Sequence, residues 1–317
     1  VKTQAELVEL RAANRRLQRR LAAKDERTAE LIAAVHRAAK DAAVIVGQPP
    51  RVKQPAKDRR RDGEVALLHT TDWQLGKRTD SYNPDVCEAR IRFMLERVAR
   101  LTDVQRADLP VRQLTILLGG DLTEGTAIFP GQAWEVDATG FDQLFRVASL
   151  VEYLVRGALE LFESVQVFEV PGNHGRVGRR GDSPRGDNID LVAGKIARDR
   201  IGGDPRLAWG EPSGWHRIIE VGDYRAFLVH GDQVKSFGGN LPAFGIMRKA
   251  TAWASGVVPD FHDLYMGHFH SEMTLTMPNG GRIYMTPSPE SGSEYAREFV
   301  AAKGRPGQRL HFVDPVK

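Results

Sequence analysis

Seven polar residues in this chain are of the types that bind divalent metals, and each closely follows a short apolar run. In chain order they are Asp72, Gln74, Asp121, Asn173, His230, His268 and His270, with His174 beside the fourth. Two cations about 3.5–4 Å apart need a shared anion, and Asp121 is the expected bridge. Such a pair activates a water and neutralises charge on phosphoryl oxygens, so the predicted chemistry is phosphoester hydrolysis. His174 is the expected donor of a proton to the leaving oxygen.

Each of these residues taken alone has an ordinary structural explanation. An aspartate can cap a turn or helix, Pro171-Gly172-Asn173 is typical of a turn, and a lone histidine is often a hydrogen-bonded core residue. The prediction depends on joint occurrence. Five short motifs appear in one chain: Asp-Trp-Gln, Gly-Gly-Asp, Gly-Asn-His, His-Gly-Asp and Gly-His-Phe-His.

Buried strands are needed to position these residues. Apolar runs precede the motifs at residues 65–69, 114–118, 165–170, 224–229 and 261–266. Runs of this length predict buried strands, and strand ends that meet at one sheet edge gather ligands far apart in sequence. After the last motif, residues 273–277 and 282–285 predict a hairpin, and residues 309–313 predict a final strand.

At these motifs the chain resembles the calcineurin-like metallophosphoesterase superfamily, over about residues 65–270. The resemblance implies an α/β fold, a four-layer sandwich of two mixed β-sheets flanked by helices. It also implies two ligand sets, which share one carboxylate: Asp72, Gln74, Asp121 and His270 around one metal, and Asp121, Asn173, His230 and His268 around the other. Such mixed oxygen and nitrogen shells suit Mn²⁺, with Fe²⁺, Zn²⁺ and Mg²⁺ as alternatives.

Two residues depart from the superfamily pattern. Gln74 stands where the first motif usually has histidine, and a neutral amide oxygen is a weaker ligand for borderline metals. Gly175 stands where the third motif usually ends in an acid that could orient His174. We therefore expect one metal to bind loosely and His174 to rely on another partner or on solvent.

DNA is the predicted substrate. Residues 69–77 are most similar to the first motif of SbcD-type DNA repair nucleases, which implies a DNA nuclease or exonuclease. Four arginines crowd a glycine-rich segment after the third motif: Arg176, Arg179, Arg180 and Arg185. They could hold substrate phosphates, and a solvated loop is the equal alternative. Phe129 and Trp134 could stack on bases, but core packing is the expected role.

Other functions stay open. The SbcD-type nucleases carry a DNA-capping domain and a region that binds an ATPase partner, and the 47 residues after His270 leave no room for either. No ATPase partner is therefore predicted. The alternatives are a small-molecule phosphodiesterase, a phosphoprotein phosphatase, or a non-catalytic assembly protein with a decayed site.

Residues 1–47 are predicted to form a helix that pairs in a coiled coil. One heptad phase places Leu7, Asn14, Leu21, Thr28, Val35 and Ala42 at a, and Leu10, Leu17, Lys24, Leu31, Ala38 and Ile45 at d. Asparagine at an a position favours a parallel pair, so we expect a homodimer. The alternative is a single helix packed on the catalytic domain.

Composition gives the remaining boundaries. Residues 48–62 are rich in Pro, Lys and Arg and predict an exposed linker, which leaves residues 63–317 as the catalytic domain. The helix, linker and catalytic domain carry net charges of +4, +4 and −4. The single Cys87 excludes an intrachain disulfide. No signal peptide or membrane span is evident, so a cytoplasmic protein is expected.

Overall fold

The computed structural model describes residues 55–126, 128–129, 132–178, 180–181, 183–211, 214–235, 242–290 and 305–316. The predicted coiled coil lies outside these residues, as does the first part of the predicted linker. Residues 55–62 of the linker are mostly exposed, yet they are anchored to the first sheet and its helices. The backbone amide of Asp58 donates to Glu163 (2.9 Å), and Arg112 Nε donates to the Asp58 carbonyl (2.8 Å).

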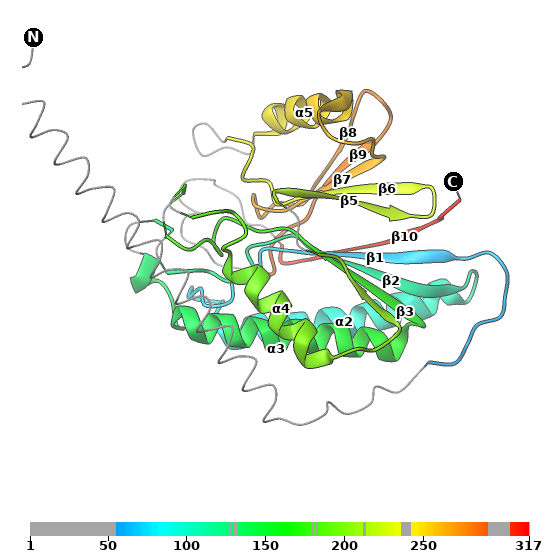
Figure 1. Cartoon of the computed structure of the whole chain (residues 1–317), viewed down its shortest axis with the longest axis horizontal. Coiled ribbons are helices and arrows are strands. Elements are labelled where there is room, and N and C mark those ends of the chain that lie inside the picture. Colours follow the sequence, from blue (N-terminus) through cyan, green and yellow to red (C-terminus); the bar gives the residue numbers. More distant parts are fainter. Residues whose placement is uncertain are drawn as a thin grey trace, which may run out of the picture. The chain divides into compact units, whose positions relative to one another are not determined.

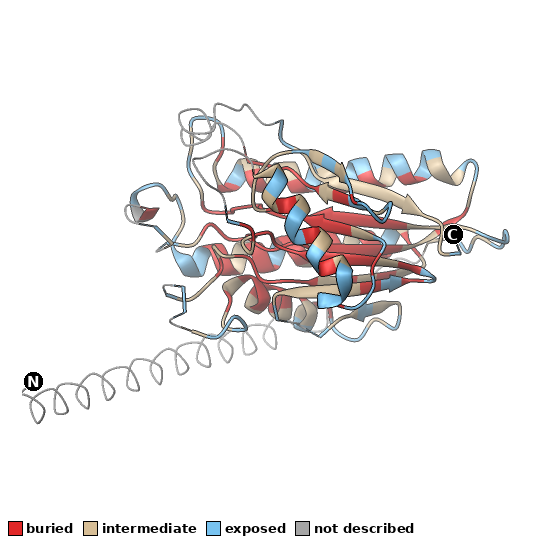
Figure 2. Ribbon diagram, turned by 90° about the horizontal axis from the view of Figure 1, so that it is seen from above, coloured by how far each residue is buried: buried red, intermediate tan, exposed pale blue. Residues whose placement is uncertain are grey.

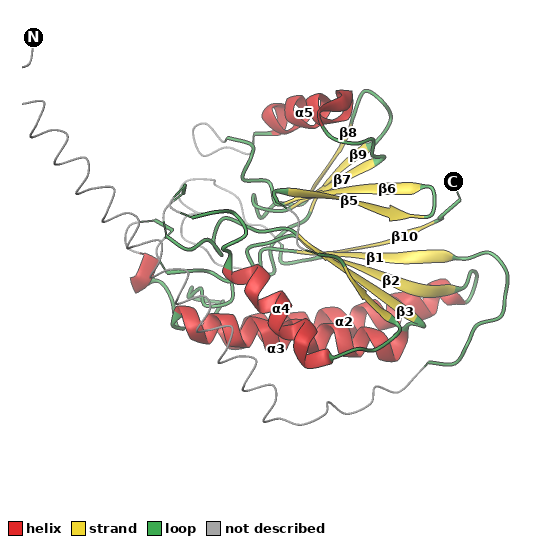
Figure 3. Cartoon of the chain, viewed as in Figure 1, coloured by secondary structure: helices red, strands yellow, loops and turns green. Residues whose placement is uncertain are grey.

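The described residues form two mixed sheets of five strands each, drawn in yellow in Figure 3. The first sheet has the order β10-β1-β2-β3-β4. Its strands are β1 (Glu64–Thr70), β2 (Val111–Leu118), β3 (Ser164–Glu169), β4 (Leu207–Trp209) and β10 (Arg309–Val313). Strands β1 to β4 are parallel, and β10 pairs antiparallel with β1.

The second sheet has the order β5-β6-β7-β9-β8. Its strands are β5 (His216–Val221), β6 (Tyr224–Val229), β7 (Asp263–Met266), β8 (Met273–Thr276) and β9 (Arg282–Met285). Strands β6, β7 and β9 are parallel, and the two edge strands are antiparallel to their neighbours. The predicted hairpin is confirmed as β8 and β9, with Gly280 at φ 88° in its turn.

Helices cover the outer faces of both sheets (Figure 1). On the first sheet lie α2 (Pro84–Arg106), α3 (Gly140–Leu161) and α4 (Ile189–Ile201), and on the second lies α5 (Ala243–Ala252), followed by the π-helical turn η2 (Trp253–Val257). Polar caps begin three of them: Asn83, Thr139 with Asp142, and Asn188. The four layers predicted from the sequence are confirmed. None of the described helices is long and apolar enough to cross a membrane.

The core follows the two-residue period of the strands. In β6, Ala226 and Leu228 pack between the sheets with Leu117 of β2, while Phe227 and Val229 face the cluster under α5. Figure 2 shows the inner strands mostly buried, the edge strands partly exposed and the helices exposed along their outer faces. The second sheet is thus packed on both faces, against the first sheet on one face and under α5 on the other. This packing fixes the positions of the strand ends.

Candidate metal centre

The loops after β1, β2, β3, β6 and β7 meet at one end of the two sheets. Within each sheet these strands are parallel, so their carboxyl ends share an edge. Backbone hydrogen bonds join neighbouring loops: Asp72 N donates to Gly120 O, and Gly267 N to His230 O, both at 2.9 Å. Other contacts join the loops of the two sheets, among them the one between His230 Nδ1 and Gly119 O at 2.8 Å.

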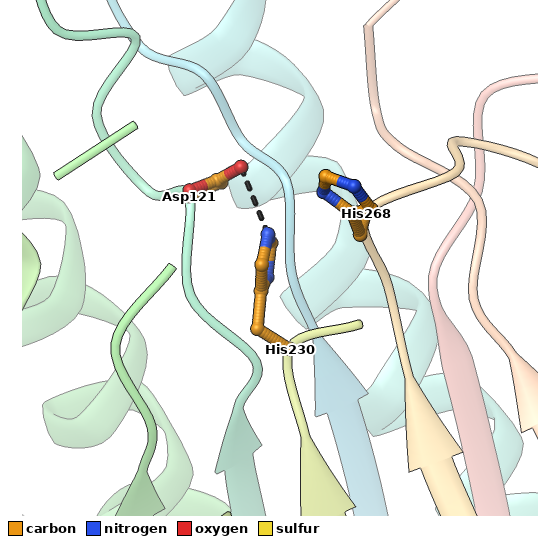
Figure 4. A group of neighbouring side chains, drawn as sticks. All are labelled: Asp121, His230 and His268. Atoms are coloured by element: carbon orange, nitrogen blue, oxygen red, sulfur yellow. Dashed lines mark ion pairs between the residues drawn. The ribbon is translucent and has the colours of Figure 1, made fainter. Parts of the chain in front are cut away.

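Asp121, His230 and His268 form the tightest cluster of candidate ligands (Figure 4). Their ligand atoms all lie within 4.8 Å of one another, and His230 Nε2 is 3.0 Å from Asp121 Oδ2. Asn173 joins them, with Oδ1 3.2 Å from the same imidazole nitrogen. Since Gly119 O can only accept, Nδ1 of His230 carries a proton and Nε2 faces two oxygen acceptors. A divalent cation that displaced the Nε2 proton would find the His230 nitrogen and both oxygens already positioned as ligands.

A second group of candidate ligands adjoins the first. Asp72 is fully buried, and both of its carboxylate oxygens accept from the His268 backbone amide, at 3.2 and 2.9 Å. His270 Nε2 lies 3.5 Å from Asp72 Oδ1. Gln74 is bound through its backbone to Asp121, whose carbonyl accepts from Gln74 N at 2.9 Å. Contacts thus link all seven residues predicted as ligands, but Gln74 joins the others only through its backbone.

The amide oxygen of Gln74 is engaged by a neighbour. Lys77 Nζ lies 3.1 Å from Gln74 Oε1 and 3.2 Å from Glu290 Oε2. An ammonium thus competes for the oxygen that the resemblance assigns to a metal. The two groups of candidate ligands differ as a result. The ligand atoms of Asp121, His230 and His268 are close enough to share one ion, whereas the amide oxygen of Gln74 contacts the Lys77 ammonium.

Backbone conformation singles out the same residues. Six non-glycine residues in the described ranges have positive φ, and five of them are predicted ligands: Asp72, Gln74, Asp121, His268 and His270. Left-handed backbone is uncommon outside glycine and costs free energy, so it persists where surrounding structure enforces it, typically at functional sites. The backbone angles are independent of the sequence motifs, and they mark the same residues.

Two glycines in the motifs leave room for the carboxylates. A β-carbon at Gly172 would lie 2.0 Å from Asp121 Oδ1, and one at Gly267 would lie 2.1 Å from Asp72 Oδ2. Neither distance is sterically tolerable. The Gly-Asn-His and Gly-His-Phe-His motifs therefore need glycine because the loops approach the two acidic side chains directly.

The charges of the centre suit cations. Burial raises the pKa of Asp121, but His230 and His174 lower it further, and His270 likewise lowers the pKa of Asp72, so both are ionised. Despite burial, Asp121 raises the pKa of His230 to about 10, and Asp72 and Glu290 raise that of His270 to about 9. Burial and His230 lower the pKa of His268 to about 4. Without metal, the protonated imidazoles of His230 and His270 thus supply the positive charge that bound cations would supply.

His174 has partners that the sequence did not reveal. Its Nδ1 lies 2.7 Å from the Glu124 carbonyl, 3.4 Å from Glu124 Oε2 and 3.5 Å from Gln132 Nε2. Its backbone amide donates to Asp121 Oδ1 at 2.7 Å. Burial lowers the pKa of His174, but Asp121 and Glu124 raise it to about 9. The expectation of another partner in place of an acid at position 175 is met by Glu124.

The glycine at position 175 has a steric cause. A β-carbon there would lie 2.4 Å from Asn188 Oδ1 and 2.9 Å from the Asp190 carboxylate. Asn188 caps α4, and Asp190 accepts from Thr123 through its backbone amide and hydroxyl. An acid at position 175 would therefore clash with the start of α4.

Glu290 was missed by the sequence analysis. Its Oε2 lies 3.1 Å from His270 Nδ1, and its Oε1 is buried with no hydrogen-bond partner among the described residues. Nearby, Ser288 Oγ donates to the Asp72 carbonyl at 2.6 Å. No motif marks either residue, because both reach the centre from the segment after β9. Their only sequence signal is polarity in a Pro-containing stretch.

The arginine segment borders the Asn173 side of the centre. A cavity of about 250 Å³ is lined by Asn173, Arg176, Arg180, Arg185 and Asp232, among others. Arg185 Nη2 lies 3.5 Å from Asp232 Oδ2. Arg179 lies outside the described residues.

The expected core role of Phe129 and Trp134 is wrong. Their exposed fractions are 42% and 83%. Both belong to the segment between Asp121 and α3, which includes the 3₁₀ turn η1 (Gln132–Trp134).

Comparisons with known proteins give distant likenesses of fold. No family model and no curated protein matches the chain. Vps29 from Entamoeba histolytica, solved with zinc, is 15% identical, with 77% of this chain and 84% of that chain covered and a TM-score of 0.35. A predicted phosphoesterase from Streptococcus pneumoniae is 12% identical (79% and 99% covered, TM-score 0.31), and phosphopantetheinyl hydrolase from Mycobacterium tuberculosis is 11% identical (79% and 96%, TM-score 0.34). These likenesses are too distant to indicate an activity.

Proposed function

We propose that this protein is a two-metal phosphodiester hydrolase and that its substrate is DNA. The observation that carries the proposal is the convergence of Asp72, Asp121, His230, His268 and His270 at one end of two sheets, four of them with left-handed backbone. The donor set of carboxylates, imidazoles and an amide fits Mn²⁺ or a similar ion. A site that had lost its function would not be expected to keep the costly left-handed backbone at five predicted ligands.

Each metal has its own set of ligands in this proposal, and the two sets share Asp121. Asp121, Asn173, His230 and His268 would hold one ion, and Asp72, Asp121, His270 and Gln74 the other. When bound, the pair supplies an activated water and neutralises charge on the phosphoryl oxygens. Gly119 O orients His230, and Glu290 orients His270, so both rings present Nε2 to the centre.

His174 is the proposed general acid. Because Nδ1 faces the Glu124 carbonyl, it carries a proton, which leaves Nε2 to donate to the leaving oxygen. The pKa of about 9 keeps the ring protonated near neutral pH. Glu124 holds its orientation, and the backbone bond from His174 to Asp121 would fix its distance from the metals.

DNA is favoured over smaller esters by the charge around the cleft. Arg176, Arg180 and Arg185 line a cavity that begins at the ligand Asn173, and arginines beside a hydrolytic centre suit a chain of phosphates. The SbcD-like first motif supports the same substrate. A small-molecule phosphodiesterase would keep the metals but need no such surface.

One assay tests the activity and the substrate together. The pure protein is incubated with Mn²⁺ and labelled single- or double-stranded DNA, beside bis-p-nitrophenyl phosphate. DNA cleavage that is lost in Asp121→Asn and kept in the exposed control Asp103→Asn is the expected result. Cleavage of the dye ester alone would indicate a small-molecule phosphodiesterase. No turnover with Mn²⁺, Fe²⁺, Zn²⁺ or Mg²⁺ would refute the proposal.

We also propose a homodimer formed through residues 1–47. Replacing two d-position leucines with glutamate, Leu10→Glu and Leu17→Glu, would place charge in the seam. Light scattering should then show the mass falling from about twice to once the chain mass of 35.2 kDa. Equal masses for both proteins would rule out this mode of pairing.

A further inference from the structure

Trp134 presents its indole ring to solvent beside the proposed active site. Of the five tryptophans, Trp73 and Trp253 are buried and Trp209 and Trp215 are half-buried, while Trp134 is 83% exposed. Phe129, five residues earlier, is also exposed. Large exposed aromatic rings close to a functional site commonly mark a contact surface for a ligand.

The backbone around Trp134 is held by hydrogen bonds on both sides, and on one side it is held at the centre. Gln132, two residues earlier, donates to the Glu124 carbonyl (2.7 Å) and lies 3.5 Å from His174 Nδ1. The Trp134 carbonyl accepts from Arg78 Nη2 at 3.0 Å. Two residues span at most about 7 Å, so the Trp134 backbone lies within one nucleotide's reach of Gln132. The exposed ring of Trp134 is therefore carried by a backbone that hydrogen bonds fix in place.

The same segment contacts the arginine cavity. Arg176 Nη2 donates to the Ile128 carbonyl at 3.2 Å, and Arg176 Nε is buried without a hydrogen-bond partner among the described residues. An unpaired buried guanidinium donor next to a cavity suits an anionic ligand. The aromatic segment and the arginine cavity thus form one border of the proposed centre, with π-faces and cationic donors together.

We propose that the substrate is a single-stranded nucleic acid, that Trp134 stacks on an unpaired base, and that Arg176 and Arg180 hold its phosphates. This inference rests on the proposed function. In a duplex both faces of each internal base are covered by its neighbours, so a protein ring can stack only on a base that is unpaired or terminal. Arginine and aromatic side chains together are the recurring chemistry of single-strand binding.

Binding is tested without cleavage, in EDTA, with a labelled single-stranded oligonucleotide and its blunt duplex. Stacking on one base corresponds to an affinity change of about 5- to 150-fold on removal of the ring, so Trp134→Ala should bind the single strand at least 5-fold more weakly. Trp134→Phe, which keeps a ring, should recover most of the affinity. Phe93→Ala, at a ring 58% exposed on α2, is the matched control and should bind normally.

A second measurement protects the inference against misfolding of the alanine variant. The single strand should quench the tryptophan fluorescence of the unaltered protein, and Trp134→Phe should remove that quenching. An oligonucleotide of abasic residues should neither quench nor bind as tightly. Equal affinity of Trp134→Ala and the unaltered protein, or tighter binding of the duplex, would overturn the inference.

The proposed function fails on different evidence. Hydrolysis of bis-p-nitrophenyl phosphate by the unaltered protein tests the metal centre without testing the stacking surface. Dye-ester hydrolysis combined with unchanged oligonucleotide affinity in Trp134→Ala would remove the stacking role alone. Loss of oligonucleotide affinity without any hydrolysis would keep the nucleic-acid site and remove the activity.

Discussion

Glu290 lies 3.1 Å from His270, through its Oε2 and the Nδ1 of the imidazole. The other ring nitrogen of His270 faces Asp72, so the ring is held between two carboxylates. Lys77 adds a third contact, to the same Oε2 of Glu290. A carboxylate behind a histidine ligand fixes its tautomer and raises its basicity.

Glu290→Gln is expected to weaken the Asp72 side of the centre. The amide keeps the shape but loses the charge that orients His270 and balances Lys77. Outer-shell substitutions typically cost about 10- to 100-fold in metal affinity or activity, and we expect the lower end. Titration calorimetry with Mn²⁺ measures the affinity. Glu272→Gln, at an acid whose side chain is 73% exposed, is the control; an equal effect of both would contradict the orienting role.

Gln74→His is expected to tighten metal binding on that side. Imidazole is a better ligand than a neutral amide for borderline metals, and histidine tolerates the left-handed backbone found at this position. The substitution also releases Lys77 from the Gln74 oxygen. Turnover at limiting Mn²⁺ should rise several-fold, which is read from the metal concentration at half-maximal rate. An unchanged metal requirement would show that residue 74 is not a ligand.

The strands and the first ligands could be predicted because both depend on local sequence. Short apolar runs ending in polar motifs gave the ends of β1, β2, β3, β6 and β7, and the motifs then placed Asp72, Asp121 and His230 at those ends. The run before His268 predicted a strand from residue 261, but β7 begins at Asp263. His262 precedes the strand: its backbone amide donates to the Arg225 carbonyl of β6, but the Arg225 amide donates to the His262 side chain and not to the backbone of β7.

The supporting residues could not be predicted, because tertiary packing places them. Glu290 lies 20 residues after His270, and Gln132 lies in a 3₁₀ turn with no ligand motif. The exposure of Trp134 was equally hidden, because aromatic content alone favours burial. For Glu290 and Gln132 the contact with the centre joins segments 20 and 42 residues apart in the chain.

Metal affinity is expected to fall steeply as the pH is lowered. His230 and His270 have pKa values of about 10 and 9 without metal, so both are protonated near neutral pH and must lose a proton to bind a cation. His268, with its pKa lowered to about 4, is already neutral there. Binding should release about two protons between pH 6 and 8. Calorimetry in buffers of different ionisation enthalpy counts them, and a count near zero would contradict the assigned ligands.

Gly172→Ala is expected to lower activity on the order of 100-fold while leaving the fold. The added methyl group would lie 2.0 Å from Asp121 Oδ1 and 2.2 Å from its backbone amide, so the Asp121 carboxylate must move. A displacement of about 1 Å at a reacting centre costs on the order of 100-fold in rate, and overpacking costs about 1–3 kcal/mol of unfolding free energy. Gly186→Ala is the matched control, because nothing lies within 4 Å of its added carbon. Turnover, bound metal and urea unfolding are measured for both variants. Full metal occupancy and normal turnover in Gly172→Ala would show that the position of Asp121 is not what the centre requires.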